Sequence, residues 1–208
     1  MLQTQWGYTL STLNSLPDLI TTADFNTITA NKYSTDGRVA PGIKAASQSI
    51  RDYCGWHVYP STTCTYTGQL GITQNIRLNG TRRGWELLIQ LPTTLLTAVS
   101  SVEIGGHSMP NFSFEPNGLV RVYKLGYANL SSYTPVEVTY TAGATDISSI
   151  QALVANAVSH SLSAPLGVTS ETADGVSISY DKTWGTGANA LTNDNVTTLA
   201  PYKLQGMF

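Results

Sequence analysis

The chain has 208 residues, enough for one large domain or two small ones, and 41% of them are hydrophobic, enough to bury a core. Only 12% are charged and the formal net charge is −2, so no strong field attracts nucleic acid or an anionic membrane. No run reaches the roughly 20 apolar residues of a membrane span, and the first residues lack the basic start and apolar run of a signal peptide. We therefore expect synthesis in a cytoplasm and two cysteines that are free thiols.

The N-terminal part is predicted to begin with an arm and to continue with a short helix. Residues 1–17 are polar and rich in Ser and Thr, and we expect an extended arm that a neighbouring subunit holds through Trp6 and Tyr8. A short helix is predicted within residues 18–32, with Thr22 as its N-cap and Phe25 on its apolar side.

The next helix has the clearest pattern in the chain. Its apolar residues recur at steps of four and three and therefore share one face, at Val39, Ile43, Ala46, Ile50 and Tyr53. The opposite face is predicted to hold Lys44, Gln48 and Arg51. Gly55 follows Cys54 and suits the left-handed conformation that ends a helix, so we expect residues 56–59 to lead directly into a sheet.

Between residues 61 and 143 the hydrophobic period changes to two, which indicates short strands. Asn79-Gly80 predicts the turn of a hairpin whose arms are residues 74–78 and 85–91. Further strands are predicted within residues 99–104, 112–114, 119–125 and 136–140. About six short strands bounded by turn residues are typical of an antiparallel sandwich or barrel-like module.

The helical period returns after Gly143. A helix capped by Asp146 is predicted to run to about residue 163. An extended arm is expected over residues 168–190, followed by a short helix over 194–199 and an apolar tail over 201–208. We predict an α+β fold in which a helical domain, built from both ends of the chain (18–60 and 144–200), carries an inserted antiparallel β-sandwich-like module (61–143).

Residues of the types that act in catalysis or bind metals are scattered along the sequence. Cys54, His57 and Cys64 are three possible metal ligands, but His57 and Cys64 do not have a usual zinc spacing and no fourth ligand is near. His107 is expected in a turn and His160 near a helix end, and no Gly-x-Ser-x-Gly elbow is present. We predict no catalytic residue, no metal ligand and no cofactor.

Charged residues and tryptophans leave one alternative open. Glu86, Glu103 and Glu137 are predicted on the solvent faces of strands, and nothing in the sequence brings two of them into a cleft, as a glycosidase requires. Arg82 and Arg83 lie at a hairpin tip that does not match a phosphate loop. The alternative is a carbohydrate-binding β module that uses Trp85 or Trp184 as a stacking platform.

Two features favour a role in assembly instead. A surface poor in charge suits a protein that is largely covered by partners. Both ends of the chain are apolar, and a hydrophobic terminal segment has a purpose when it docks into another molecule.

Several runs resemble the head–tail connector (adaptor) proteins of long-tailed bacteriophages. The most specific is residues 45–60, which hold a Tyr-Cys-Gly-Trp-His run at the end of a helix, as in that family. Looser similarity, reaching over about residues 20–205, is found at residues 24–29, 36–39, 91–92, 99–104, 136–143 and 170–180 and in the helix from Ile147. Residues 1–17 and Cys64 are not part of the pattern.

This resemblance implies a virion structural protein that is not an enzyme. Its copies would form a homo-oligomeric ring, a dodecamer, under the portal protein, and the ring would extend the channel for viral DNA without sequence-specific binding. The far side would receive a stopper, a tail-completion or a tail terminator protein. The C-terminal segment would dock onto the portal through Leu199, Tyr202, Leu204, Met207 and Phe208. The protein would lie in the virion neck, between capsid and tail, with no membrane contact; a head-completion stopper or tail-side ring protein is the alternative within this class.

Overall fold

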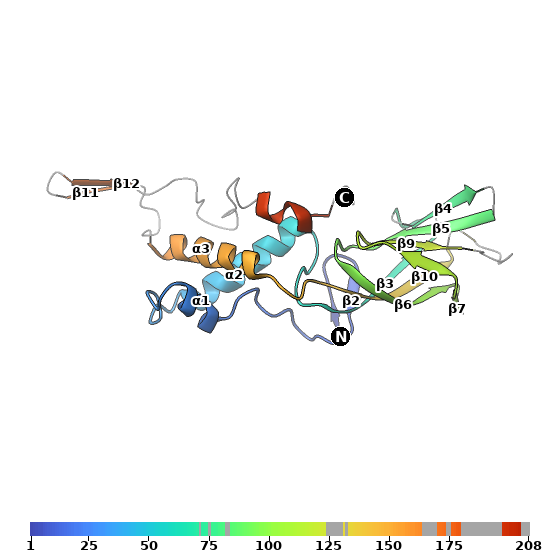
Figure 1. Cartoon of the computed structure of the whole chain (residues 1–208), viewed down its shortest axis with the longest axis horizontal. Coiled ribbons are helices and arrows are strands. Elements are labelled where there is room, and N and C mark those ends of the chain that lie inside the picture. Colours follow the sequence, from blue (N-terminus) through green and yellow to red (C-terminus); the bar gives the residue numbers. More distant parts are fainter. Residues whose placement is uncertain are drawn as a thin grey trace. The chain divides into compact units, whose positions relative to one another are not determined.

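The structure is a computed structural model. It describes residues 1–70, 72–74, 76–81, 84–123, 131, 133–163, 170–173, 176–179 and 197–204. The chain divides into two compact units (Figure 1). The first, here called the β unit, contains Met1–Leu16, Gly55–Thr145 and Tyr202–Phe208; the second unit contains Pro17–Cys54 and Asp146–Pro201.

The β unit contains a six-stranded antiparallel sheet in the order β1-β2-β3-β10-β6-β7. Its strands are β1 (Leu2–Gln3), β2 (Tyr8–Leu10), β3 (Thr62–Gln69), β6 (Leu96–Ile104), β7 (His107–Ser108) and β10 (Pro135–Ala142). Alternate residues point to opposite faces of a sheet, so Tyr8, Tyr66 and Val138 line one buried row across three strands. Both edge strands are only two residues long.

A second antiparallel sheet in the same unit has the order β4-β5-β9-β8. Its strands are β4 (Ile76–Thr81), β5 (Gly84–Gln90), β8 (Phe112–Phe114) and β9 (Leu119–Val122). Leu87, Ile89, Val120 and Val122 are fully buried on one face. The burial of apolar faces on both sheets builds the core of the β unit.

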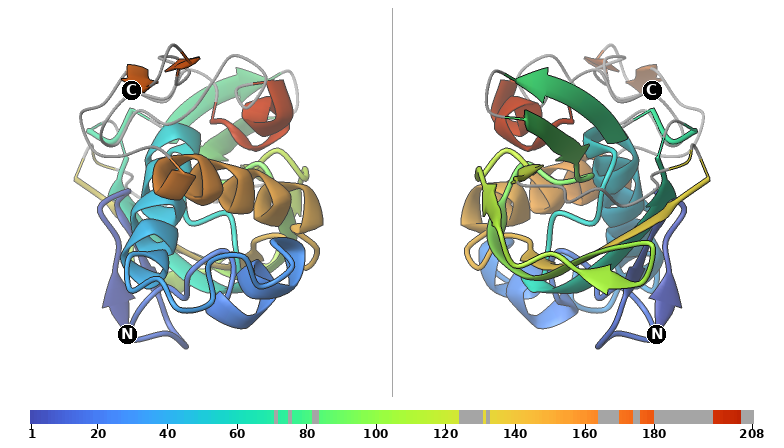
Figure 2. Two further views of the ribbon diagram at one scale, coloured as in Figure 1. Left: turned by 90° about the vertical axis from the view of Figure 1, so that its left-hand side faces the viewer. Right: turned by 90° about the vertical axis from the view of Figure 1, so that its right-hand side faces the viewer.

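The second unit holds α1 (Thr22–Ile28), α2 (Val39–Cys54) and α3 (Ser148–Ser163). Thr21, one residue before the predicted cap, accepts a hydrogen bond from the Asp24 N–H and so caps α1. Helix α2 packs against α3 (Figure 2), and a Cβ on Gly42 would lie only 3.3 Å from a methyl of Val158, so a glycine lets the helices approach closely.

The apolar face of α2 is confirmed at Val39, Ile43 and Ile50, each at most 3% exposed. Its predicted polar face is wrong at Arg51, which is 3% exposed and donates to the Pro17 carbonyl. A guanidinium can be buried because it meets a carbonyl there.

Strands β11 (Ser170–Ala173) and β12 (Val176–Ser179) pair with each other, and a short 3₁₀ helix, η1, covers Ala200–Tyr202.

The predicted fold class is wrong. The described residues are mostly β, with two antiparallel sheets of six and four strands and a few short helices, and they do not form a helical domain with an inserted β-sandwich-like module. The error has a physical cause at the N-terminus, where Tyr8-Thr9-Leu10 is too short for a period of two to be recognised. Pairing with β3, more than 50 residues away, makes it a strand.

The predicted hairpin is confirmed, but its turn is displaced. Asn79 pairs with Glu86 and Thr81 with Gly84, so Asn79-Gly80 lies within strand β4 rather than in the turn. Arg82, Arg83 and Trp184 lie outside the described residues, as do most of the predicted arm over 168–190 and the first part of the predicted helix over 194–199. In the described part of the chain, every helix is too short or too polar to cross a membrane.

Candidate functional site

The residues after α2 are buried in the β unit. Gly55 has a φ of 80°, the left-handed conformation predicted for the end of the helix. Trp56, His57 and Val58 are each at most 1% exposed. They form a loop rather than the predicted start of a sheet, and the loop bonds back to the end of β10 through the Ala144 N–H, 2.8 Å from the Val58 carbonyl.

His57 lies at the centre of a buried polar network. Its Nε2 is 3.1 Å from the Pro60 carbonyl oxygen and 3.2 Å from that of Ala142. Carbonyls only accept hydrogen bonds, so Nε2 carries the proton and donates it. The Tyr8 hydroxyl lies 2.7 Å from Nδ1 and also accepts from the His57 backbone N–H at 3.0 Å. Thus Tyr8 joins the N-terminal strand β2 to the loop and to β10.

This network does not provide a reactive site. Both ring nitrogens of His57 are engaged within the protein, so neither is presented to a metal ion or a substrate. Burial raises the pKa of the Cys64 thiol to about 12, so the thiol stays protonated and unreactive at neutral pH. Among the residues that the structure describes, no three His, Cys, Asp or Glu side chains gather as metal ligands would.

The predicted docking tail begins inside its own unit. The Trp56 indole Nε1 donates to the Tyr202 carbonyl at 2.6 Å, and Leu204 is 7% exposed. Leu199, in the second unit, is fully buried. Met207 and Phe208 lie outside the described residues. Residues 202–204 are therefore part of the folded chain.

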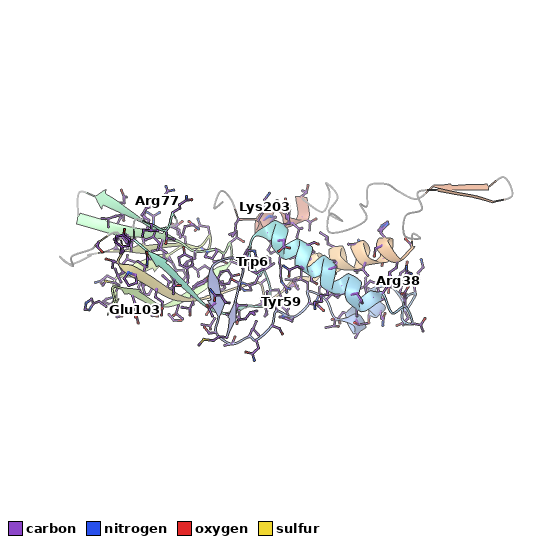
Figure 3. All side chains as sticks on the ribbon, turned by 180° about the vertical axis from the view of Figure 1, so that it is seen from behind. Trp6, Arg38, Tyr59, Arg77, Glu103 and Lys203 are labelled. Atoms are coloured by element: carbon purple, nitrogen blue, oxygen red, sulfur yellow. The ribbon has the colours of Figure 1, made fainter. Side chains whose placement is uncertain are left out.

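The two predicted arm residues differ in their surroundings. Tyr8 is 2% exposed, within the core of its own chain. Trp6, labelled in Figure 3, is partly exposed. Its ring stacks on that of Tyr8, with the ring centroids 6.3 Å apart. Of these two residues, Trp6 is the one with exposed surface.

Each sheet of the β unit has charged residues in an outward-facing row. On the six-stranded sheet, Glu137 of β10 lies directly opposite Glu103 of β6. On the four-stranded sheet, Arg77, Leu88 and Arg121 form one row across β4, β5 and β9. The prediction put Glu103 and Glu137 on solvent faces but missed that they are neighbours, because only the strand register brings together residues so far apart in sequence.

Comparison with known proteins identifies one family. A family model described as head completion protein matches residues 18–190. The match includes most of both units and excludes residues 1–17 and 191–208. No curated protein matches the chain.

Proposed function

Because the chain belongs to the head completion protein family, we propose that it is a head–tail connector that forms a ring under the portal protein of a phage head. The ring, a dodecamer as the resemblance implies, extends the channel through which viral DNA passes. Its far side receives a stopper, tail-completion or tail terminator protein in the neck of the virion.

Part of this rests directly on the family. Its members have a structural role in completing the phage head, which makes the chain a virion-associated protein that interacts with other head or tail proteins. The similarity to connector proteins stated for residues 45–60 is confirmed by the match over residues 18–190. That match is the single observation that carries the proposal.

The contacts within the chain agree with a connector. His57 and the thiol of Cys64 are closed to substrates. The C-terminal segment is fixed to Trp56 at Tyr202, only six residues before the end of the chain. This anchor fixes Tyr202 on the β unit, three residues before the segment 205–208 that we propose docks onto the portal.

The decisive experiment is deletion of residues 205–208 in the phage that encodes the chain. The deletion keeps Tyr202 and Leu204, so we expect an unchanged unfolding temperature. We expect DNA-filled heads that lack both the chain and tails, seen by electron microscopy and by mass spectrometry of purified particles. Replacement of the same residues by Gly-Ser-Gly-Ser separates the chemistry of the tail from its length.

The outcome also distinguishes the alternatives. Loss of the chain from heads in both variants supports docking onto the portal through the tail. Retention on heads with loss of tails alone identifies a stopper or a tail-side role. Normal tailed particles from both variants would refute the docking segment, and wild-type particles that lack the chain would refute the connector itself.

A further inference from the structure

The four-stranded sheet has one long edge with no strand beside it. Strand β4 lies at the end of the order β4-β5-β9-β8 and has six residues. The other edge strands that the structure describes in the β unit are shorter, with two residues each in β1 and β7 and three in β8. Proteins usually protect an edge with a bulge or a proline, but β4 has an unbroken register with β5 and contains no proline. It therefore presents a row of backbone donors and acceptors to which another strand can bond.

The register shows which backbone groups of β4 point away from the sheet. Thr81 pairs with Gly84, and the pair that closes a hairpin with two residues between its strands is hydrogen-bonded. Bonded and non-bonded pairs alternate along an antiparallel ladder, so Leu78 and Leu87, three pairs further along, are a non-bonded pair. The N–H and C=O of Leu78 therefore point to the free edge. Within the described part of the chain, no backbone hydrogen bond outside the sheets involves Leu78.

The side chain of Leu78 is also partly uncovered. Its cross-strand partner Leu87 is fully buried, but Leu78, on the same face of the sheet, is 42% exposed. The reason is that β4 is an edge strand, so no further strand covers Leu78 from that side. A strand added beside β4 would bond the backbone of Leu78 and cover its apolar side chain at the same place.

The chain also contains a hairpin that lacks a third strand. Strands β11 and β12 pair with each other and form a sheet of their own, labelled in Figure 1. A hairpin of two strands is at best marginally stable by itself in water, and a third strand stabilises it. Each of its strands has four residues, a length that β4 can match and that β1, β7 and β8 cannot. The hairpin and β4 each lack the neighbouring strand that the other can supply.

We propose that the β11–β12 hairpin of one copy pairs with the free edge of β4 in the next copy. Within a single chain the hairpin and β4 belong to different sheets, which argues for a second copy as the partner. Each copy gives a hairpin at one surface and receives one at another, and such head-to-tail contacts can close into a ring. The inference rests on the proposed connector function and adds a contact between its subunits. Both parts lie within residues 18–190, which the family model matches.

Photo-cross-linking in assembled particles identifies what lies beside β4. The photoreactive amino acid p-benzoylphenylalanine replaces Arg77, an exposed residue of β4 that Figure 3 labels, and the variant is supplied by phage complementation. After irradiation of purified particles we expect a cross-linked dimer on denaturing gels. Mass spectrometry should find residues 170–179 in the peptide that joins the two chains. The same amino acid at Lys44, an exposed position on α2, is the control and should not join to residues 170–179.

Two substitutions of Leu78 test the backbone contact separately from the side chain. Leu78→Pro removes the N–H that points to the free edge and leaves the bonds from β4 to β5 in place, because a proline is tolerated at this side of an edge strand. Leu78→Ala removes most of the side chain and keeps the N–H. We expect the yield of infectious particles to fall by about tenfold or more for Leu78→Pro, and clearly less for Leu78→Ala, because the proline leaves a carbonyl of the hairpin without its donor.

The possible outcomes separate this contact from the connector function. A cross-link to residues 170–179 within one chain would place the hairpin beside β4 of its own copy and refute the contact between copies. A dimer joined through other residues, or particles that contain the chain but give no cross-link, would also refute it, and in these cases the connector function stands. Equal yields for a folded Leu78→Pro protein and for Leu78→Ala would refute strand pairing, and if Leu78→Pro does not fold, the cross-link decides alone. Wild-type particles that lack the chain would instead refute the connector function.

Discussion

Replacement of Tyr8 by phenylalanine separates two roles for the N-terminal segment. A residue of an inter-subunit arm should matter for assembly and not for the stability of a single chain. The structure gives Tyr8 contacts within its own chain instead, to the Nδ1 and backbone N–H of His57. Tyr8→Phe keeps the buried ring and removes the hydroxyl, so it tests these two hydrogen bonds directly.

The expected cost follows from the burial of the site. Tyr8 is 2% exposed and His57 1% exposed, so water does not replace the lost hydroxyl. A buried polar group that loses its partner costs about 1–3 kcal/mol, and two groups of His57 are affected, so we expect a loss of about 3 kcal/mol. In a chain of this length, that corresponds to a fall of about 6–12 °C in unfolding temperature.

Tyr140→Phe is a matched control in the same core. The ring of Tyr140 lies 6.5 Å from that of Tyr8, and its buried hydroxyl has no hydrogen bond of good geometry, with only the weakly bonding thiol of Cys64 beside it. Its removal should therefore be neutral or slightly stabilising. Thermal and urea unfolding of both variants decide the matter. Equal stability of the two variants would refute the His57 network, and a stable Tyr8→Phe protein that fails to assemble would restore the arm interpretation.

Two further predictions concern the same unit. Gly143 has a φ of 122°, and a Cβ there would collide with the Pro60 carbonyl, so Gly143→Ala should lower the free energy of unfolding, measured in urea, by about 3 kcal/mol. Gly106→Ala, which has open space around it, should lower it clearly less. Equal losses for the two variants would contradict the close approach at Gly143. Burial raises the pKa of Cys64 from 9.0 to about 12. Between these two pH values only the unfolded state loses the thiol proton, so the free energy of unfolding falls as pH rises, by up to about 1.4 kcal/mol per pH unit. Cys64→Ala should show a shallower decline between pH 8 and 10.5, and an unchanged slope would argue against the buried neutral thiol.

Helix α2 could be predicted from the sequence because its stabilising pattern is local. Steps of three and four place Val39, Ile43 and Ile50 on one face, and all three are buried. Arg51 was placed wrongly because its partner, the Pro17 carbonyl, is 34 residues away. A periodic pattern identifies a face, but it does not show which distant carbonyl allows a charged residue to enter it.

The hairpin of the four-stranded sheet shows how burial can outweigh a turn signal. A two-residue turn at Asn79-Gly80 would pair Leu78 with Thr81 and Ile76 with Arg83, so the apolar residues of the first strand would lie opposite polar ones. The observed register pairs Ile76 with Ile89 and Leu78 with Leu87, which aligns the buried faces. The strongest local signal thus lost to the pairing that buries more apolar surface.

The site itself depends on long-range contacts. Tyr8 and His57 are 49 residues apart, and Trp56 and Tyr202 are 146 residues apart. The sequence therefore predicts that both ends of the chain are apolar, but it does not show what they contact. The three-dimensional contacts place Tyr8 in the core and show that Tyr202 anchors the tail.

The two-residue strands at both edges of the six-stranded sheet would have a consequence in the ring that we propose. A long exposed edge is a template on which further chains can add strands without limit, as in amyloid. Here β1 and β7 offer only a short row of backbone donors and acceptors. In the proposed ring, these two strands would give a neighbouring copy little backbone to pair with, which favours contacts between copies through side chains at this sheet.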